Sequence, residues 1–119
     1  MDNRRVYPRL VTRHLVKVTR EDGSEVGDIS YIYDLSEGGL RLICHEILDI
    51  HTVLNITFYI PEKDKSTNVR AKVLWLLPIK QQEGSYFAGL QFLKLSDDIR
   101  GAIHSFYVFL LNQRPEVSY

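Results

Sequence analysis

The residues Leu54-Asn55-Ile56-Thr57-Phe58-Tyr59-Ile60 show a regular alternation of apolar and more polar side chains. Every second side chain from Leu54 to Ile60 is a large apolar one, and polar residues or a tyrosine stand between them. This period of two is typical of a β-strand with one face in the core and the other toward solvent. Pro61 follows directly, and proline cannot donate a hydrogen bond within a sheet. We therefore predict a strand that ends at Ile60.

Further runs of the chain predict five more strands. The stretch Asn68–Leu77 alternates in the same way, with Arg70 and Lys72 on the polar side and an apolar side that we expect to be buried. That apolar side comprises Val69, Ala71, Val73 and Trp75. The other runs are 14–19, 26–34, 40–44 and 86–93, separated by glycine or proline turn signals. In 40–44 the apolar residues share one face and Arg41 lies on the opposite face.

Only the end of the chain predicts a helix. Ser96 suits the N-cap position, and Asp97 and Asp98 place negative charge in the first turn, where the helix dipole favours it. Apolar side chains then recur at helical spacing and predict one buried stripe; they are Ile99, Ala102, Ile103, Phe106 and Leu110. Gly101 interrupts the same segment at a cost of about 1 kcal/mol relative to alanine.

Six short strands followed by one amphipathic helix predict a mainly β protein, a six-stranded antiparallel barrel with a C-terminal helix. A chain of 119 residues makes one domain. We expect a basic arm at 1–13, the barrel at 14–95, the helix at 96–112 and a tail at 113–119.

The net charge of zero conceals an asymmetry along the chain. Residues 1–20 hold six basic side chains and one acidic one, whereas residues 21–119 hold nine basic and fourteen acidic ones. A basic segment before an acidic body is typical of an anion-binding arm, although the charge count alone favours a disordered tail.

Composition also excludes several classes of protein. The chain lacks the apolar run of roughly 20 residues that a membrane-spanning helix needs, and its basic start is not followed by the apolar stretch of a secretion signal. Cys44 is the single cysteine, which excludes a disulfide framework, and the four histidines lack the spacing of a zinc motif. We therefore expect a cytoplasmic protein with no metal, no cofactor and no membrane insertion.

Two short motifs carry the candidate chemistry. The first is R-x-x-x-R at Arg5 and Arg9, with Arg4 directly before it. Arginine offers a planar fork of donors that suits phosphate oxygens and the O6/N7 edge of guanine. The second is D-x-S-x-x-G at Asp34, Ser36 and Gly39. Its carboxylate can accept hydrogen bonds from a guanine edge, although a turn that satisfies its own backbone is the alternative interpretation.

Together these motifs resemble the PilZ domain family, the bacterial receptors for cyclic di-GMP. The two elements lie 24 residues apart here, and the resemblance continues through Val69–Trp75, Gly89–Phe92 and the helix that follows Ser96. It implies a PilZ-type barrel whose N-terminal arm folds over the ligand. It also implies a binding protein without catalytic residues.

The resemblance implies a role for each motif residue. Arg5 and Arg9 would hold phosphate and guanine, and Asp34 and Ser36 would bind a guanine edge. The glycines Gly38 and Gly39 would let the turn approach the purine. Family members with an additional arginine before the first motif tend to bind an intercalated ligand dimer, and Arg4 occupies that position.

Trp75 has two interpretations. A tryptophan at the end of a strand is most often part of the core, because it buries a large area. The alternative, which some members of the family suggest, is that it flanks or stacks on a guanine of the ligand at the mouth of the barrel.

A chain with no output domain must signal through contact with another protein, which the sequence does not identify. A nucleotide-independent adaptor with the same fold is the alternative. A DNA- or RNA-binding barrel is disfavoured, because the body is net acidic and its strands do not interleave basic with aromatic residues. An enzyme is disfavoured because no nucleophile elbow or metal signature accompanies Asp34 and Ser36.

Overall fold

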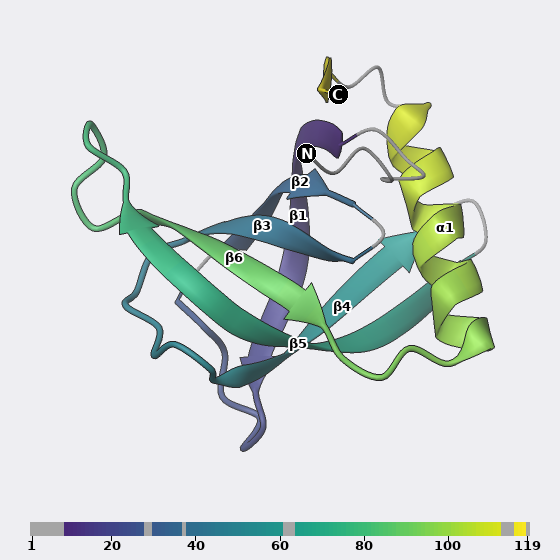
Figure 1. Cartoon of the computed structure of the whole chain (residues 1–119), viewed down its shortest axis with the longest axis horizontal. Helices are drawn as coiled ribbons and strands as arrows, with labels where there is room; N and C mark the ends of the chain where they lie inside the picture. The colour runs from purple at the N-terminus through teal and green to yellow at the C-terminus, as the bar shows by residue number, and fades with distance from the viewer. Residues whose placement is uncertain (1–8, 28–29, 37, 61–63, 113–115, 119) are drawn as a thin grey trace, which may run out of the picture.

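The computed structural model of the chain describes residues 9–27, 30–36, 38–60, 64–112 and 116–118. Its strands are β1 (Arg9–Arg20), β2 (Ser30–Leu35), β3 (Gly39–Cys44), β4 (Val53–Ile60), β5 (Lys65–Pro78), β6 (Tyr86–Phe92) and β7 (Glu116–Ser118). The sheet order is β2-β3-β6-β5-β4-β1-β7, and β1 also pairs with β2. This extra pairing closes β1 to β6 into the predicted antiparallel barrel (Figure 1).

The inward-facing apolar side chains of β4 fill part of the interior of the barrel. Leu54, Ile56 and Phe58 are at most 1% exposed, while Tyr59 is 46% exposed. The inward side chains of β5 are buried in the same way, from Val69 to Val73. The two stretches that predicted a half-buried strand therefore line the core as expected.

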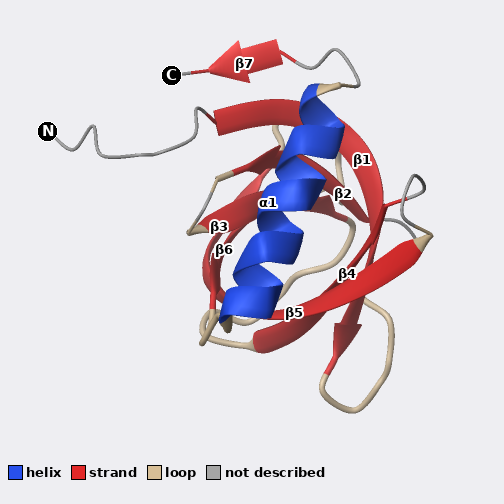
Figure 2. Ribbon diagram, turned by 90° about the vertical axis from the view of Figure 1, so that its right-hand side faces the viewer, coloured by secondary structure: helices blue, strands red, loops and turns tan. Residues whose placement is uncertain are grey.

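The helix α1 (Asp97–Leu111) lies across one end of the barrel (Figure 2). The hydroxyl of Ser96 accepts a hydrogen bond from the backbone N–H of Ile99 at 3.2 Å, which confirms the predicted N-cap. Phe106 from the helix stacks on Phe58 of β4 with ring centroids 4.6 Å apart. The predicted apolar stripe thus anchors the helix to the barrel core.

Both ends of the chain differ from the sequence prediction. β1 begins at Arg9, within the predicted arm of 1–13, and β7 lies within the predicted tail of 113–119. β7 pairs with the start of β1, where Leu10 lies opposite Val117. Because β2 pairs with the same residues on the other edge of β1, partners on both sides extend the strand beyond the predicted boundary.

Local backbone features explain two further differences. β2 begins at Ser30 and not at Val26, because Gly27 adopts a φ of 60° in the left-handed region and ends the extended conformation. In β5, the pairing register with β6 shifts by one residue between Val73 and Trp75. This β-bulge reverses the alternation, so Trp75 lies outside the hydrophobic core, contrary to the parity of the sequence.

Candidate functional site

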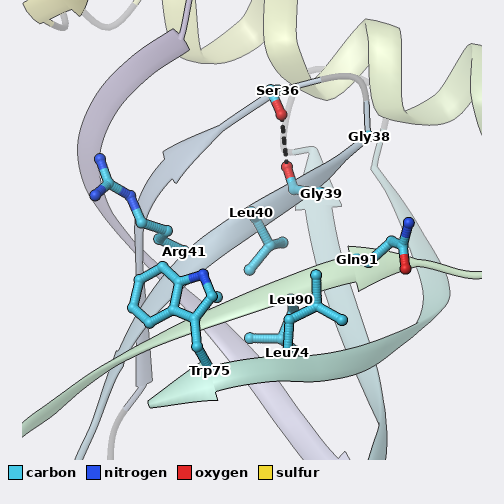
Figure 3. Close-up of a pocket in the computed structure, with 10 residues that line it drawn as sticks. Ser36, Gly38, Gly39, Leu40, Arg41, Leu74, Trp75, Leu90 and Gln91 are labelled. Carbon is cyan, nitrogen blue, oxygen red and sulfur yellow. Dashed lines mark hydrogen bonds between the residues drawn. The ribbon is translucent and has the colours of Figure 1, made fainter. Parts of the chain in front are cut away.

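A pocket of about 460 Å³ opens on the outer side of the barrel, where the β2–β3 turn meets β3, β5 and β6 (Figure 3). Its lining consists of Ser36, Gly38, Gly39, Leu40, Arg41, Leu74, Trp75, Gly89, Leu90 and Gln91. Four predicted site residues therefore share this pocket, namely Ser36, Gly38, Gly39 and Trp75.

Ser36 shapes the turn at one edge of the pocket. Its backbone N–H donates to the carbonyl oxygen of Gly39 at 2.9 Å, and its hydroxyl donates to the same oxygen at 3.3 Å. The carbonyl oxygen of Gly38 accepts from the backbone N–H of Phe92 at 3.0 Å, which ties the turn to β6. The hydroxyl thus stabilises its own turn, as the alternative interpretation of this motif required, and it also faces the pocket.

The two glycines of the turn differ in what they contact. A Cβ atom at Gly39 would overlap the carbonyl oxygen of Leu90, so the packing of β3 against β6 itself requires glycine there. A Cβ atom at Gly38 would have no atom of the described residues within 4 Å. Only Gly38 therefore offers open space for a ligand beside the turn, whereas we expected the same role for both glycines.

Asp34 is fully buried and bound to Arg41. Its Oδ2 accepts from Arg41 Nε at 2.7 Å and also from Nη2 of the same guanidinium. The side chain of Arg41 is 36% exposed and lines the pocket, whereas Asp34 does not. Hydrogen bonding to Asp34 raises the pKa of Arg41, so the guanidinium stays charged. The arginine therefore lies between this carboxylate and the pocket.

The candidate site residues predicted from the sequence did not include Arg41, which was placed only on the face opposite the apolar residues of 40–44. The guanidinium also lies over the ring of Tyr33, 5.2 Å from the centroid, and Tyr33 meets Phe87 edge-on at 5.0 Å. A signal was present: the tight turn between β2 and β3 makes Asp34 and Arg41 cross-strand partners, and opposite charges in such positions attract.

Trp75 forms the wall of the pocket that belongs to β5. Its side chain is half-buried and lies on the outside of the barrel. Its indole lies against Gly89 of β6, and a Cβ atom at position 89 would overlap the ring. Figure 3 shows the indole on the same side of the sheet as Arg41, with Leu40 and Leu90 beside it. A flat aromatic face and a cation thus border one pocket, an arrangement that suits a purine with a phosphate.

The arginine motif approaches this pocket through β1. Leu10 pairs with Leu35 and Val11 pairs with Asp34, so the backbone of Arg9 enters β1 beside the turn that carries Ser36. Arg4 and Arg5 lie outside the described residues. The last arginine of the first motif therefore enters the sheet at the end of the β1–β2 pair that carries the second motif.

Within the described ranges, no group of three or more histidine, cysteine, aspartate or glutamate side chains is placed to hold a metal ion. None of the helices described is long and apolar enough to cross a membrane.

A model of the PilZ domain family matches residues 3–109. The chain belongs to this family. The match covers both motifs, the whole barrel and most of α1, so the PilZ resemblance of the sequence is confirmed.

Several solved structures share the fold of this chain at low sequence identity. The PilZ domain of Escherichia coli YcgR with cyclic di-GMP is 16% identical with a TM-score of 0.72, and the match covers 94% of this chain and 95% of that domain. The Klebsiella pneumoniae MrkH complex with cyclic di-GMP is 16% identical with a TM-score of 0.67, covering 96% of this chain and 55% of MrkH. The Bacillus subtilis inhibitor of motility MotI is 14% identical with a TM-score of 0.66, covering 95% of this chain and 52% of MotI.

This PilZ chain thus spans about half the length of MrkH and MotI. A comparison with curated protein sequences found no match.

Proposed function

We propose that this PilZ domain is a cytoplasmic, non-catalytic receptor for cyclic di-GMP. The observation that carries the proposal is the β1–β2 register, which brings the entry of β1 at Arg9 to the turn that holds Ser36 and Gly38. Family membership and the fold shared with cyclic di-GMP complexes of YcgR and MrkH support it.

In this proposal the arm provides the charge and the turn provides the recognition of guanine. Arg5 and Arg9 bind phosphate and guanine, and Arg4 favours an intercalated ligand dimer. Ser36 lies in reach of a ligand in the pocket. Asp34 reads a guanine edge after a shift of Arg41, since its carboxylate is fully buried behind that side chain in the structure. The N1–H and the exocyclic amine of guanine donate hydrogen bonds that a carboxylate such as Asp34 can accept.

Trp75 stacks on a base in the proposed complex, because its indole is outside the core and borders the pocket. Stacking of a base on an aromatic side chain is worth about 1–3 kcal/mol. The site needs no cofactor, since binding alone is the signal. Ligand binding fixes the arm over the pocket, and the affinity must cover an ordering entropy of about 1–2 kcal/mol for each backbone residue fixed.

The bound receptor signals by contact with a protein partner. A cross-strand row of apolar residues on the outside of the barrel supports this part of the proposal, with Leu15, Tyr31, Ile43, Phe87 and Leu77 paired in that order across five strands. We call it the outer apolar row. Leu15 and Leu77 at its ends are 59% and 57% exposed, whereas Ile43 at its centre is 8% exposed. Apolar surface of this kind is typical of interaction sites.

The outer apolar row lies beside the pocket. Tyr33, which holds Arg41, packs edge-on against Phe87 of the row. A ligand and arm placed over the pocket would therefore extend the same surface. The row would also serve the alternative function, a nucleotide-independent adaptor. The two differ in one respect, because capture of the partner depends on added cyclic di-GMP only for the receptor.

The emission of Trp75 tests the receptor function, since it is the single tryptophan of the chain. Cyclic di-GMP added to the whole chain should change the emission saturably at micromolar concentration, and cyclic di-AMP should not. If neither nucleotide changes the emission or binds by equilibrium dialysis, the proposed receptor function is wrong.

A further inference from the structure

Arg41 has the position of a ligand-binding residue although it belongs to neither motif. It lines the pocket with a side chain that is 36% exposed, while its partner Asp34 is 0% exposed. A ligand that enters the pocket therefore meets the guanidinium before it meets the carboxylate.

The guanidinium is held in one orientation from two sides. Asp34 takes hydrogen bonds from Nε and Nη2 through a single oxygen, and the ring of Tyr33 lies 5.2 Å beneath the carbon that joins the three nitrogens. A guanidinium has five N–H donors, and two are used here. Within the described residues no other acceptor engages Arg41, so its remaining donors are available toward solvent.

A guanidinium that is held in place at the rim of a pocket, with donors still available, favours the binding of an anion there. An arginine that is already oriented loses less entropy on binding than a mobile one, and its fork suits phosphate oxygens. Cyclic di-GMP carries two phosphates, and the motif arginines alone need not neutralise both.

We propose that Arg41 binds a phosphate of the ligand, with Asp34 as the positioning residue that aims its guanidinium. The inference rests on the proposed function, because it names a further residue of the same site. It gives the buried carboxylate a second role, which does not require it to leave Arg41 when the ligand arrives.

A second arginine of the chain provides a matched control. Arg70 on β5 also pairs with a carboxylate, Glu21, at 2.5 Å, but both side chains are more than half exposed and neither lines the pocket. Arg70→Gln removes the same charge from the protein at a place where no ligand is expected.

The experiment is calorimetric titration of cyclic di-GMP into the whole chain and into Arg41→Gln, Arg41→Lys and Arg70→Gln at several salt concentrations. Loss of a hydrogen bond to a charged group predicts that Arg41→Gln weakens binding about 10-fold or more. Arg41→Lys should recover part of this loss, and Arg70→Gln should bind like the parent. The salt dependence of the affinity should also decrease for Arg41→Gln alone, since one charge contact with phosphate is gone.

The positioning role of Asp34 requires a double-mutant cycle. Asp34→Asn should weaken binding much less in the Arg41→Gln background than in the parent, because its effect passes partly through Arg41. The double variant also avoids a buried carboxylate without a cation, so it keeps the test independent of folding. Thermal melts of all variants identify any that are unfolded.

These measurements test the role of Arg41, the role of Asp34 and the proposed function separately. If the parent binds cyclic di-GMP and Arg41→Gln binds equally well, or weakly with an unchanged salt dependence, Arg41 does not bind phosphate. If the losses from the two substitutions simply add, Asp34 does not position Arg41. If the parent itself fails to bind, both this inference and the proposed function are wrong.

Discussion

The indole of Trp75 lies against the α-carbon of Gly89, so closely that any side chain at position 89 would overlap the ring. The contact follows from the β-bulge between Val73 and Trp75, which turns the tryptophan out of the barrel and opposite Gly89 of β6. It places the single tryptophan of the chain at the wall of the pocket.

Gly89→Ala should therefore displace the indole. Overpacking of this kind typically costs about 1–3 kcal/mol in the free energy of unfolding. We expect a lower urea midpoint, a shift in tryptophan emission and weaker binding of cyclic di-GMP. Unchanged emission together with unchanged binding would show that the indole does not depend on Gly89.

The turn glycines allow a paired prediction that separates folding from ligand binding. Gly39→Ala should destabilise the fold, because its Cβ would overlap the carbonyl oxygen of Leu90. Gly38→Ala should leave the thermal midpoint within a few degrees of the parent, since the Cβ meets open space. If the ligand approaches this turn, Gly38→Ala weakens binding of cyclic di-GMP without a change in stability. Equal effects of both substitutions on stability would contradict the geometry of the turn.

Gly101→Ala should stabilise the protein. Gly101 is exposed in α1, and apart from its chain neighbours and the backbone of its own helix no atom of the described residues lies within 4 Å of the position of its missing Cβ. Replacing glycine by alanine inside a helix is worth up to about 1 kcal/mol, and we expect an increase of about 0.5–1 kcal/mol in urea denaturation. Ligand affinity should not change, because α1 does not line the pocket. A decrease in stability would mean that the helix needs glycine at this position.

Most of the barrel could be predicted from alternation, because Leu54, Ile56 and Phe58 bury one side of a regular strand. The pattern could not show where a bulge reverses the alternation, since a single extra residue such as Leu74 leaves no mark in composition. For this reason Trp75 was expected to share the face of Val73, and the structure places it in the pocket wall.

The ligand-binding roles of the motif residues stay a prediction. The structure shows that Ser36, Gly38 and Gly39 line one pocket and that the partner of Asp34 comes from a neighbouring strand. Such a pair depends on strand register, which motif spacing along the sequence does not contain. The packing role of Gly39 could not be inferred from the sequence either, because the atom that it accommodates is the carbonyl oxygen of Leu90 on another strand.

Cys44 predicts a pH dependence of stability. Burial raises the pKa of its thiol to about 11, so the folded protein holds this proton more tightly than the unfolded chain does. The stabilisation is present below the usual thiol pKa and is lost as the pH rises toward 11. Denaturation at pH 8 and pH 10 should show that the stability advantage of the parent over Cys44→Ala decreases at the higher pH. A constant difference would show that the thiol has the same pKa in the folded and the unfolded protein.

We propose that the arm and the turn form one cyclic di-GMP site, which isothermal titration of the whole chain can test. The claim predicts binding in the micromolar range or tighter, with two ligand molecules per chain if Arg4 favours the intercalated dimer. Arg5→Ala, Arg9→Ala and Asp34→Ala should each weaken it strongly, and the two arm variants should leave the thermal melt nearly unchanged. Absence of binding by the parent at tens of micromolar, or equal binding by the parent and all three variants, would contradict the claim.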